Sequence, residues 1–180
     1  MARYILTGTP GAGKTAVLRL LEVNGYRVVE ESATDVIALE TARGRENPWS
    51  DPSFVDKIIT LQRQRQLALG PSHAQPAFFD RSPVCTLALS RYLEFEPSQL
   101  LRDEIERIID GGVYDPTVFF IRNQGSIHNT AARQISFADS LDFERIHEQT
   151  YRSLGFQLVI VPPAPVDDRV ALIRRVVGSA

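Results

Sequence analysis

The amino-acid sequence predicts an α/β protein of three layers, in which a five-stranded parallel sheet carries helices on both faces. Short apolar runs alternate along the chain with longer segments of helical character, which is the pattern of strands joined by crossover helices. The runs are apolar throughout, as is typical of parallel strands buried on both sides. No linker divides the 180 residues into two compact parts, so we expect one domain over residues 1–180.

The first half of the chain contributes three strands and three helices to this prediction. The first strand stops at Gly8, the second precedes two glutamates, and the third ends at Asp80. Asn24-Gly25 stops the first helix, as is usual at helix C-termini. The predicted strands are residues 4–7, 26–29 and 77–79, the helices are 15–23, 33–42 and 54–69, and residues 43–53 have loop composition.

The second half of the chain supplies two more strands and four helices. Glycines at 111, 112 and 155 end two of the helices, and consecutive prolines at 162 and 163 end the last strand. A polar, irregular segment over about residues 122–136 separates the fourth strand from the following helix. The predicted helices are 84–93, 97–110, 137–154 and 166–177, and the strands are 117–121 and 158–161.

Charge and composition exclude several classes of protein. Twenty basic residues face twenty-two acidic ones, and a net charge of −2 removes the electrostatic basis for nonspecific nucleic-acid binding. No apolar run approaches the length of a membrane span, and the N-terminus does not have the pattern of a signal peptide. Cys85 is the only cysteine, so no intramolecular disulfide can form. We therefore expect a soluble cytoplasmic protein whose partners include neither nucleic acid nor membrane.

The strongest motif is a phosphate-binding loop of the form G-x-x-x-x-G-K-[ST], the Walker A motif, placed between the first strand and the first helix. Its glycines let backbone N–H groups point inward at phosphate oxygens, and the helix N-terminus adds partial positive charge. Lys14 is predicted to reach the β- and γ-phosphates, and the hydroxyl of Thr15 to coordinate Mg²⁺. The predicted nucleotide-binding residues are Gly8, Thr9, Pro10, Gly11, Ala12, Gly13, Lys14 and Thr15. This loop makes the predicted fold that of a P-loop NTPase.

Further candidates follow the second and third strands, because open α/β sheets bind ligands beyond the carboxyl ends of their strands. Asp80 is predicted to hold Mg²⁺, directly or through water, as a Walker B acid, and Arg81 to clamp phosphate. The alternative for this pair is a helix N-cap and a surface arginine. Glu31 is predicted to be the general base for an acceptor hydroxyl. Its alternatives are a merely solvated charge or, if the strand is displaced by one residue, Glu30 in its place.

The polar segment over about residues 122–136 lies where P-loop kinases keep a mobile lid. Arg133 is predicted to bring positive charge to the transferring phosphoryl group, as an arginine finger within the same chain. Arg122 is a second candidate for that role. The alternative is an ordinary solvated loop with surface arginines.

Other residues carry weaker signals. Trp49 lies in a polar loop and is expected either to stack on a base or aromatic acceptor or to pack against the protein. His147 and Tyr151 are four residues apart and share a helix face. No histidine has a second ligand at metal-binding spacing, so no zinc site is expected. Arg63 and Arg65 are expected to line a solvated helix face.

These residues resemble a known family. The chain is similar to the single-domain P-loop proteins classed as AAA-type ATPases, whose relatives include the kinase domain for ribosylnicotinamide, and more distantly to deoxynucleoside kinases. The resemblance rests on residues 8–15, 28–31, 47–52, 78–81 and 142–156. It implies a five-stranded fold of the kinase-like subgroup. It also places Glu31 at the acid that accepts the substrate hydroxyl proton, and Arg81 at a phosphate-binding arginine.

The predicted function is ATP–Mg²⁺-dependent transfer of a phosphoryl group to a small hydroxyl-bearing metabolite, with a nucleoside-like acceptor as one candidate. ATP is favoured over GTP because the chain lacks the Asn/Thr-Lys-x-Asp element that reads guanine. Two alternatives stay open at this point. One is a nucleotide-binding regulatory module that hydrolyses slowly and signals to a protein partner, and the other is an ATPase working in a larger assembly. The identity of the acceptor and the oligomeric state are open as well.

Overall fold

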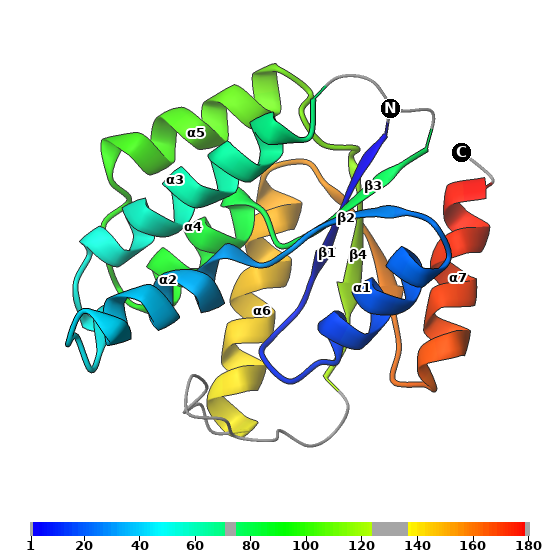
Figure 1. Ribbon diagram of the computed structural model, residues 1–180, viewed down its shortest axis with the longest axis horizontal. Coiled ribbons are helices and arrows are strands. Elements are labelled where there is room, and N and C mark those ends of the chain that lie inside the picture. The colour runs from blue at the N-terminus through cyan, green and yellow to red at the C-terminus, as the bar shows by residue number, and fades with distance from the viewer. Residues whose placement is uncertain (1, 71–74, 124–136, 179–180) are drawn as a thin grey trace.

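The computed structural model describes residues 2–70, 75–123 and 137–178 (Figure 1). The five strands form one parallel sheet in the order β2-β3-β1-β4-β5, which confirms the predicted fold. Strand β2 lies at one edge, β3 lies between β2 and β1, and β4 and β5 extend the sheet to the other edge. The strand order therefore changes direction at β1, and open α/β sheets bind their ligands beyond the carboxyl ends of the strands at such a point. The strands are β1 Arg3–Thr7, β2 Arg27–Val29, β3 Ala77–Asp80, β4 Thr117–Ile121 and β5 Gln157–Val161.

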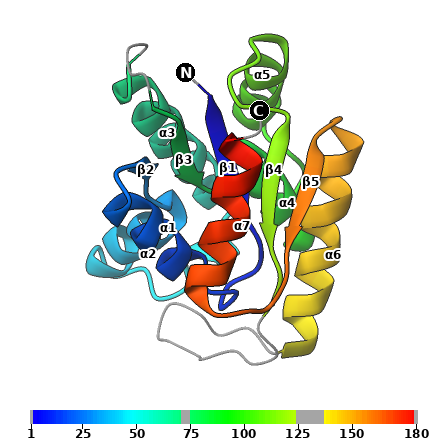
Figure 2. The same cartoon turned by 90° about the vertical axis from the view of Figure 1, so that its right-hand side faces the viewer.

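Helices cover both faces of the sheet (Figures 1 and 2). Those of the described chain are α1 Lys14–Val23, α2 Ser32–Ala42, α3 Ser53–Ala68, α4 Pro83–Tyr92, α5 Gln99–Asp110, α6 Phe137–Ser153 and α7 Val166–Gly178. Helices α1 and α7 lie on one face and α4, α5 and α6 on the other, with α3 packed against α4 and α5. Leu6 and Phe78 point into the core under α1 and α7, whereas their neighbours Ile5 and Phe79 point into the core under α4, α5 and α6. Both faces of these strands are buried, which explains their uniformly apolar sequences.

The predicted boundaries agree with the structure to within two residues, and two local differences bear on the site. Residues Pro48–Ser50 form a turn of 3₁₀ helix inside the segment predicted as a loop. Asp80 is the last residue of β3 and pairs in register with Leu6 of β1, whereas the sequence placed it just after the strand. The sheet therefore holds the backbone of Asp80 next to β1, the strand that leads into the phosphate-binding loop.

The described residues include no helix that is both long enough and apolar enough to span a membrane. Of the predicted lid, only Arg122 and Asn123 belong to the described part of the chain. Arg133 lies outside the described residues, so its predicted role stays a prediction.

Candidate functional site

The phosphate-binding loop joins the carboxyl end of β1 to the start of α1, as predicted. Gly13 has a φ of 79°, a left-handed conformation that side chains rarely adopt. Gly8 has a φ of 135°, and a Cβ on it would lie 2.2 Å from the backbone oxygen of Ile121 in β4. Lys14 is buried and its Nζ donates a 2.9 Å hydrogen bond to the carbonyl oxygen of Thr9, so the ammonium lies within the loop. The backbone itself therefore requires the motif's glycines at these two positions.

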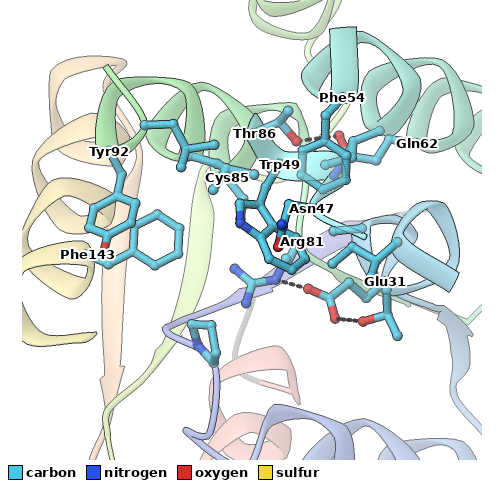
Figure 3. Close-up of a pocket in the computed structure, with 17 residues that line it drawn as sticks. Glu31, Asn47, Trp49, Phe54, Gln62, Arg81, Cys85, Thr86, Tyr92 and Phe143 are labelled. Carbon is cyan, nitrogen blue, oxygen red and sulfur yellow. Dashed lines mark hydrogen bonds and ion pairs between the residues drawn. The ribbon is translucent and has the colours of Figure 1, made fainter. Parts of the chain in front are cut away.

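Glu31 and Arg81 follow the carboxyl ends of β2 and β3 and form an ion pair with each other beside this loop (Figure 3). Arg81 follows β3 with a φ of 73°, a left-handed conformation that turns its side chain toward the N-terminus of α2. Its Nε donates to Oε1 of Glu31 in an ion pair, and Thr34 donates a 2.8 Å hydrogen bond to Oε2. Glu30, the alternative candidate, is about half exposed and pairs with Arg19. The structure thus brings Glu31, and not Glu30, to the phosphate side of the sheet.

Neighbouring charges keep both members of the pair ionised. Burial raises the pKa of Glu31, but the positive charges of Arg81 and Lys14 outweigh this effect and lower the pKa from 4.5 to about 2. Burial disfavours the charged form of Arg81, but the negative charges around it, chiefly Glu31 and also Asp80, together with the hydrogen bond to Glu31 outweigh burial and raise the pKa of Arg81 above its ordinary value. Glu31 therefore carries a negative charge at every pH at which the protein is expected to work.

Asp80 and Thr15 supply the oxygen atoms predicted for Mg²⁺. Asp80 is buried at the end of β3, and Thr15 is exposed in the first turn of α1. Within the described part of the chain, no group of three or more histidine, cysteine or acidic residues could hold a metal unaided. Mg²⁺ prefers oxygen ligands, takes few of them from protein and completes its shell with water and substrate phosphates. The two residues therefore fit an ion that arrives with a nucleotide.

A pocket of about 440 Å³ opens beside the phosphate-binding loop, between α2, α3, α4 and α6. Pro10 of the loop, Glu31 and Arg81 line the end nearest the phosphate side. The remaining walls are largely apolar and aromatic, with the rings of Trp49, Phe54, Tyr92 and Phe143 among them. This composition suits a small ligand with a flat apolar part and a hydroxyl that reaches Glu31.

Gln62 of α3 is a polar residue of the pocket that the sequence did not single out. It is 8% exposed, and its Oε1 accepts a 3.0 Å hydrogen bond from the hydroxyl of Thr86 in α4. With Oε1 held in this way, the Nε2 group is the part of the amide that can donate to a ligand. The sequence showed only a run of alternating glutamines and arginines, and the packing of α3 against α4 decides which of them face the pocket.

Helix α6 contacts Arg81 and the residue that follows it. His147 is fully buried, its Nδ1 donates a 2.9 Å hydrogen bond to the carbonyl oxygen of Phe143, and its Nε2 accepts from Arg81 at 3.4 Å. Burial and the nearby charge of Arg81 lower the pKa of His147 from 6.5 to about 3, so the ring is neutral. One turn away, Tyr151 forms a 2.7 Å hydrogen bond with Ser82, the N-cap of α4. The prediction that His147 and Tyr151 share a helix face is confirmed. Both side chains bond to the turn after β3, His147 to Arg81 and Tyr151 to Ser82.

Ion pairs to the buried Glu40 stabilise the connection between α2 and α3, which contains Trp49. The carboxylate of Glu40 is 1% exposed and pairs with Arg45 and Lys57 at 2.6 Å and with Arg43 at 3.3 Å. These pairs join α2 and α3 to the connection between them. Trp49 packs against residues of both helices and also lines the pocket, so the two roles expected for it, packing and ligand contact, are compatible.

Two other arginines hold elements of the fold together. Arg122 donates to Glu144 and Glu148 of α6 at 2.8 Å each, so it ties the end of β4 to α6. Arg65 donates to the carbonyl oxygen of Glu31 at 2.8 Å and is only 26% exposed in its side chain. The prediction of a solvated face is therefore wrong for Arg65, because α3 packs against the turn between β2 and α2.

The fold and this site define the class of protein, a P-loop nucleoside-triphosphate-binding fold of the kinase-like group. The chain belongs to the AAA domain family, whose sequence model matches residues 3–169. The predicted family is thereby confirmed, while its link to ribosylnicotinamide kinase stays a prediction.

Solved structures of deoxyadenosine kinase from M. mycoides share the fold. The structure with bound dATP has a TM-score of 0.64 at 15% sequence identity, and the alignment covers 99% of this chain and 100% of that one. The structure with the products dCMP and dCDP has a TM-score of 0.63 at 16% identity and covers 98% of both chains. Comparison with curated proteins gives no significant match. At this level of identity the likeness shows the fold alone.

Proposed function

We propose that the protein is an ATP–Mg²⁺-dependent phosphotransferase that acts on a small hydroxyl-bearing acceptor of nucleoside-like shape, and that residues 1–180 work as one domain. One observation carries the proposal: Glu31 and Arg81 lie between the phosphate-binding loop and an aromatic pocket of about 440 Å³, and both line that pocket. A switch or a simple ATPase does not need a pocket for a second ligand next to the phosphates. The proposal is supported by deoxyadenosine kinase from M. mycoides, which shares the fold and has structures with bound dATP and dCTP.

The donor half of the site binds the triphosphate. Backbone N–H groups of the loop and the ammonium of Lys14 bind phosphate oxygens, and Thr15 and Asp80 hold Mg²⁺. The bound ion would neutralise charge that develops on the phosphate oxygens. Arg81, with Nε turned to Glu31 and Nη1 near His147, lies at the junction where the phosphoryl group passes to the acceptor. Arg133 is proposed to add a further positive charge there.

The acceptor half orients a hydroxyl group. Its oxygen forms a bond to the γ-phosphorus, the bond from that phosphorus to the β–γ bridging oxygen breaks, and the hydroxyl proton passes to Glu31. A pKa of about 2 makes Glu31 a weak base. In a loose transition state the acceptor oxygen needs little deprotonation beforehand, so the fixed direction of the carboxylate contributes more than its basicity. Gln62 and the aromatic walls are proposed to hold the flat part of the acceptor.

An acceptor screen tests the proposal. Purified protein with ATP and Mg²⁺ is offered nucleosides, ribosylnicotinamide and sugars, and transfer of phosphate to the acceptor is followed by mass spectrometry. We expect phosphorylation of at least one nucleoside-like compound. ATP hydrolysis without transfer to any member of these classes would refute the kinase proposal for them.

Two substitutions at neighbouring carboxylates sharpen the test. Glu31→Gln should lower turnover by about 10²–10⁴-fold with nucleotide affinity retained, because it removes the group that orients the acceptor. Glu30→Gln makes the same charge change at an exposed neighbour and should leave turnover unchanged. The alternative function, a regulatory ATPase with a protein partner, predicts that both variants hydrolyse ATP like the unmodified protein.

A further inference from the structure

Arg169 of α7 is a buried cation close to the phosphate-binding loop, although 157 positions separate it from Ala12, the loop residue that it contacts. It is 7% exposed, and its Nη1 donates a 3.1 Å hydrogen bond to the carbonyl oxygen of Ala12. Among the described residues, its Nε has no hydrogen-bond partner and no carboxylate lies within ion-pair distance. Arg81 and Arg122, by contrast, are each paired with carboxylates. A buried charge without such a partner is costly, so its place calls for a functional reason.

The guanidinium of Arg169 lies directly against the backbone of Gly13. A Cβ added to Gly13 would meet Nη1 at 3.0 Å and Nη2 at 3.2 Å. Helix α7 packs beside α1, the helix that begins at this loop (Figure 2). Two nitrogen atoms of the Arg169 guanidinium therefore lie against the Ala12–Gly13 segment of the loop.

The contact with Ala12 fixes one peptide unit of the loop. In a planar trans peptide the C=O and N–H groups point in opposite directions. The carbonyl oxygen of Ala12 accepts from Arg169, so the N–H of the same peptide, which belongs to Gly13, points away from Arg169. Because the N–H groups of this motif point inward at phosphate oxygens, this geometry places the guanidinium on the outer side of the loop. A cation bound to a carbonyl also polarises its peptide and strengthens the N–H as a donor.

We propose that Arg169 is a positioning residue for nucleotide phosphates: it orients and polarises the Ala12–Gly13 peptide so that the loop binds the polyphosphate of a nucleoside di- or triphosphate. The inference rests on the nucleotide-binding half of the proposed function and is independent of the acceptor. Its positive charge lies behind the loop, where it attracts phosphate without touching it. The loop therefore has a charged support that the Walker A pattern does not contain.

Binding measurements with Mg–ATP and Mg–ADP test the inference by isothermal titration calorimetry. Arg169→Met keeps most of the apolar volume and removes both the charge and the donor. Arg169→Gln keeps a neutral donor, and Arg169→Lys keeps the charge. Arg174→Met, in the same helix but exposed and bonded only weakly to Asn24, is the matched control.

We expect Arg169→Met to raise the Kd for both nucleotides by about tenfold or more, which is the loss of one charge-assisted hydrogen bond. Arg169→Lys should recover most of the affinity and Arg169→Gln less, and Arg174→Met should change nothing. Circular dichroism and the melting temperature establish that each variant is folded. If Arg169→Met proves unfolded, Arg169→Gln decides alone, because a purely structural arginine predicts an unchanged Kd for this variant and the proposal predicts a higher one.

An unchanged nucleotide Kd in folded Arg169→Met or Arg169→Gln overturns the inference, and so does an equal change in Arg174→Met. Failure of the proposed function looks different: the unmodified protein binds nucleotide, Arg169→Met weakens it, and no acceptor is phosphorylated. If the unmodified protein binds neither Mg–ATP nor Mg–ADP, both proposals fall.

Discussion

Replacing Glu31 by Gln removes one half of a buried ion pair and leaves Arg81 charged. The fall of the Glu31 pKa from 4.5 to about 2 corresponds to about 3 kcal/mol in favour of the ionised carboxylate in the folded protein, at about 1.4 kcal/mol per pH unit. Because the folded pKa is the lower one, this stabilisation is fully present above the unfolded pKa of 4.5 and is lost as the pH falls toward 2. The variant should therefore be less stable than the unmodified protein at neutral pH, and the difference should shrink in acid.

Urea unfolding followed by far-UV circular dichroism measures this difference. At pH 7, Glu31→Gln should reduce the free energy of unfolding by about 3 kcal/mol. At pH 3.5 about 1 kcal/mol of that difference should have disappeared, because the carboxyl group in the unfolded chain is then mostly protonated. Comparing the two proteins at each pH cancels the contribution of His147, whose low pKa destabilises both of them in acid.

Glu30→Gln is the control, since Glu30 is exposed and, among the described residues, pairs with an exposed arginine. It should change the stability little at either pH. A difference between the unmodified protein and Glu31→Gln that is the same at pH 7 and pH 3.5 would refute the assigned low pKa. An equal pH-dependent effect of Glu30→Gln would refute the assignment of the pair to Glu31.

Three further predictions concern the loop, the pocket and α6. Gly8→Ala should destabilise the protein by more than about 3 kcal/mol, because its Cβ would lie 2.2 Å from the backbone oxygen of Ile121. The control, Gly44→Ala, should destabilise it by only about 1–2 kcal/mol, because Gly44 has a φ of +85° but open space around it. Thermal melting compares the two, and equal losses would contradict the steric argument. Gln62→Leu should raise the acceptor KM about tenfold and leave the ATP KM unchanged, since one ligand hydrogen bond is lost; steady-state kinetics showing equal changes in both constants would contradict this role. The ring of His147 should show no titration between pH 5 and 8, because its pKa is lowered to about 3; an NMR midpoint near 6.5 would contradict its burial against Arg81.

The predicted site residues differ in how far the sequence could locate them. The loop around Lys14 was identified completely, because its function depends on local backbone geometry that consecutive residues specify. Glu31 and Arg81 were placed at strand ends, and the structure adds that they pair with each other. Gln62 was missed, because its helix is rich in polar residues and only packing against α4 selects the face that lines the pocket.

The sequence by itself determined the layered fold, the strand boundaries and the phosphate-binding loop. Each of these is written in short-range patterns: apolar runs of strand length, glycines at helix ends, and eight consecutive residues of a single motif. The tertiary structure alone decided that Glu30 faces solvent while Glu31 faces the pocket, and that Arg169 lies against the backbone of Gly13. Such contacts join residues far apart in the chain, and the burial and charge that set the pKa values of Glu31 and His147 arise only when those residues come together.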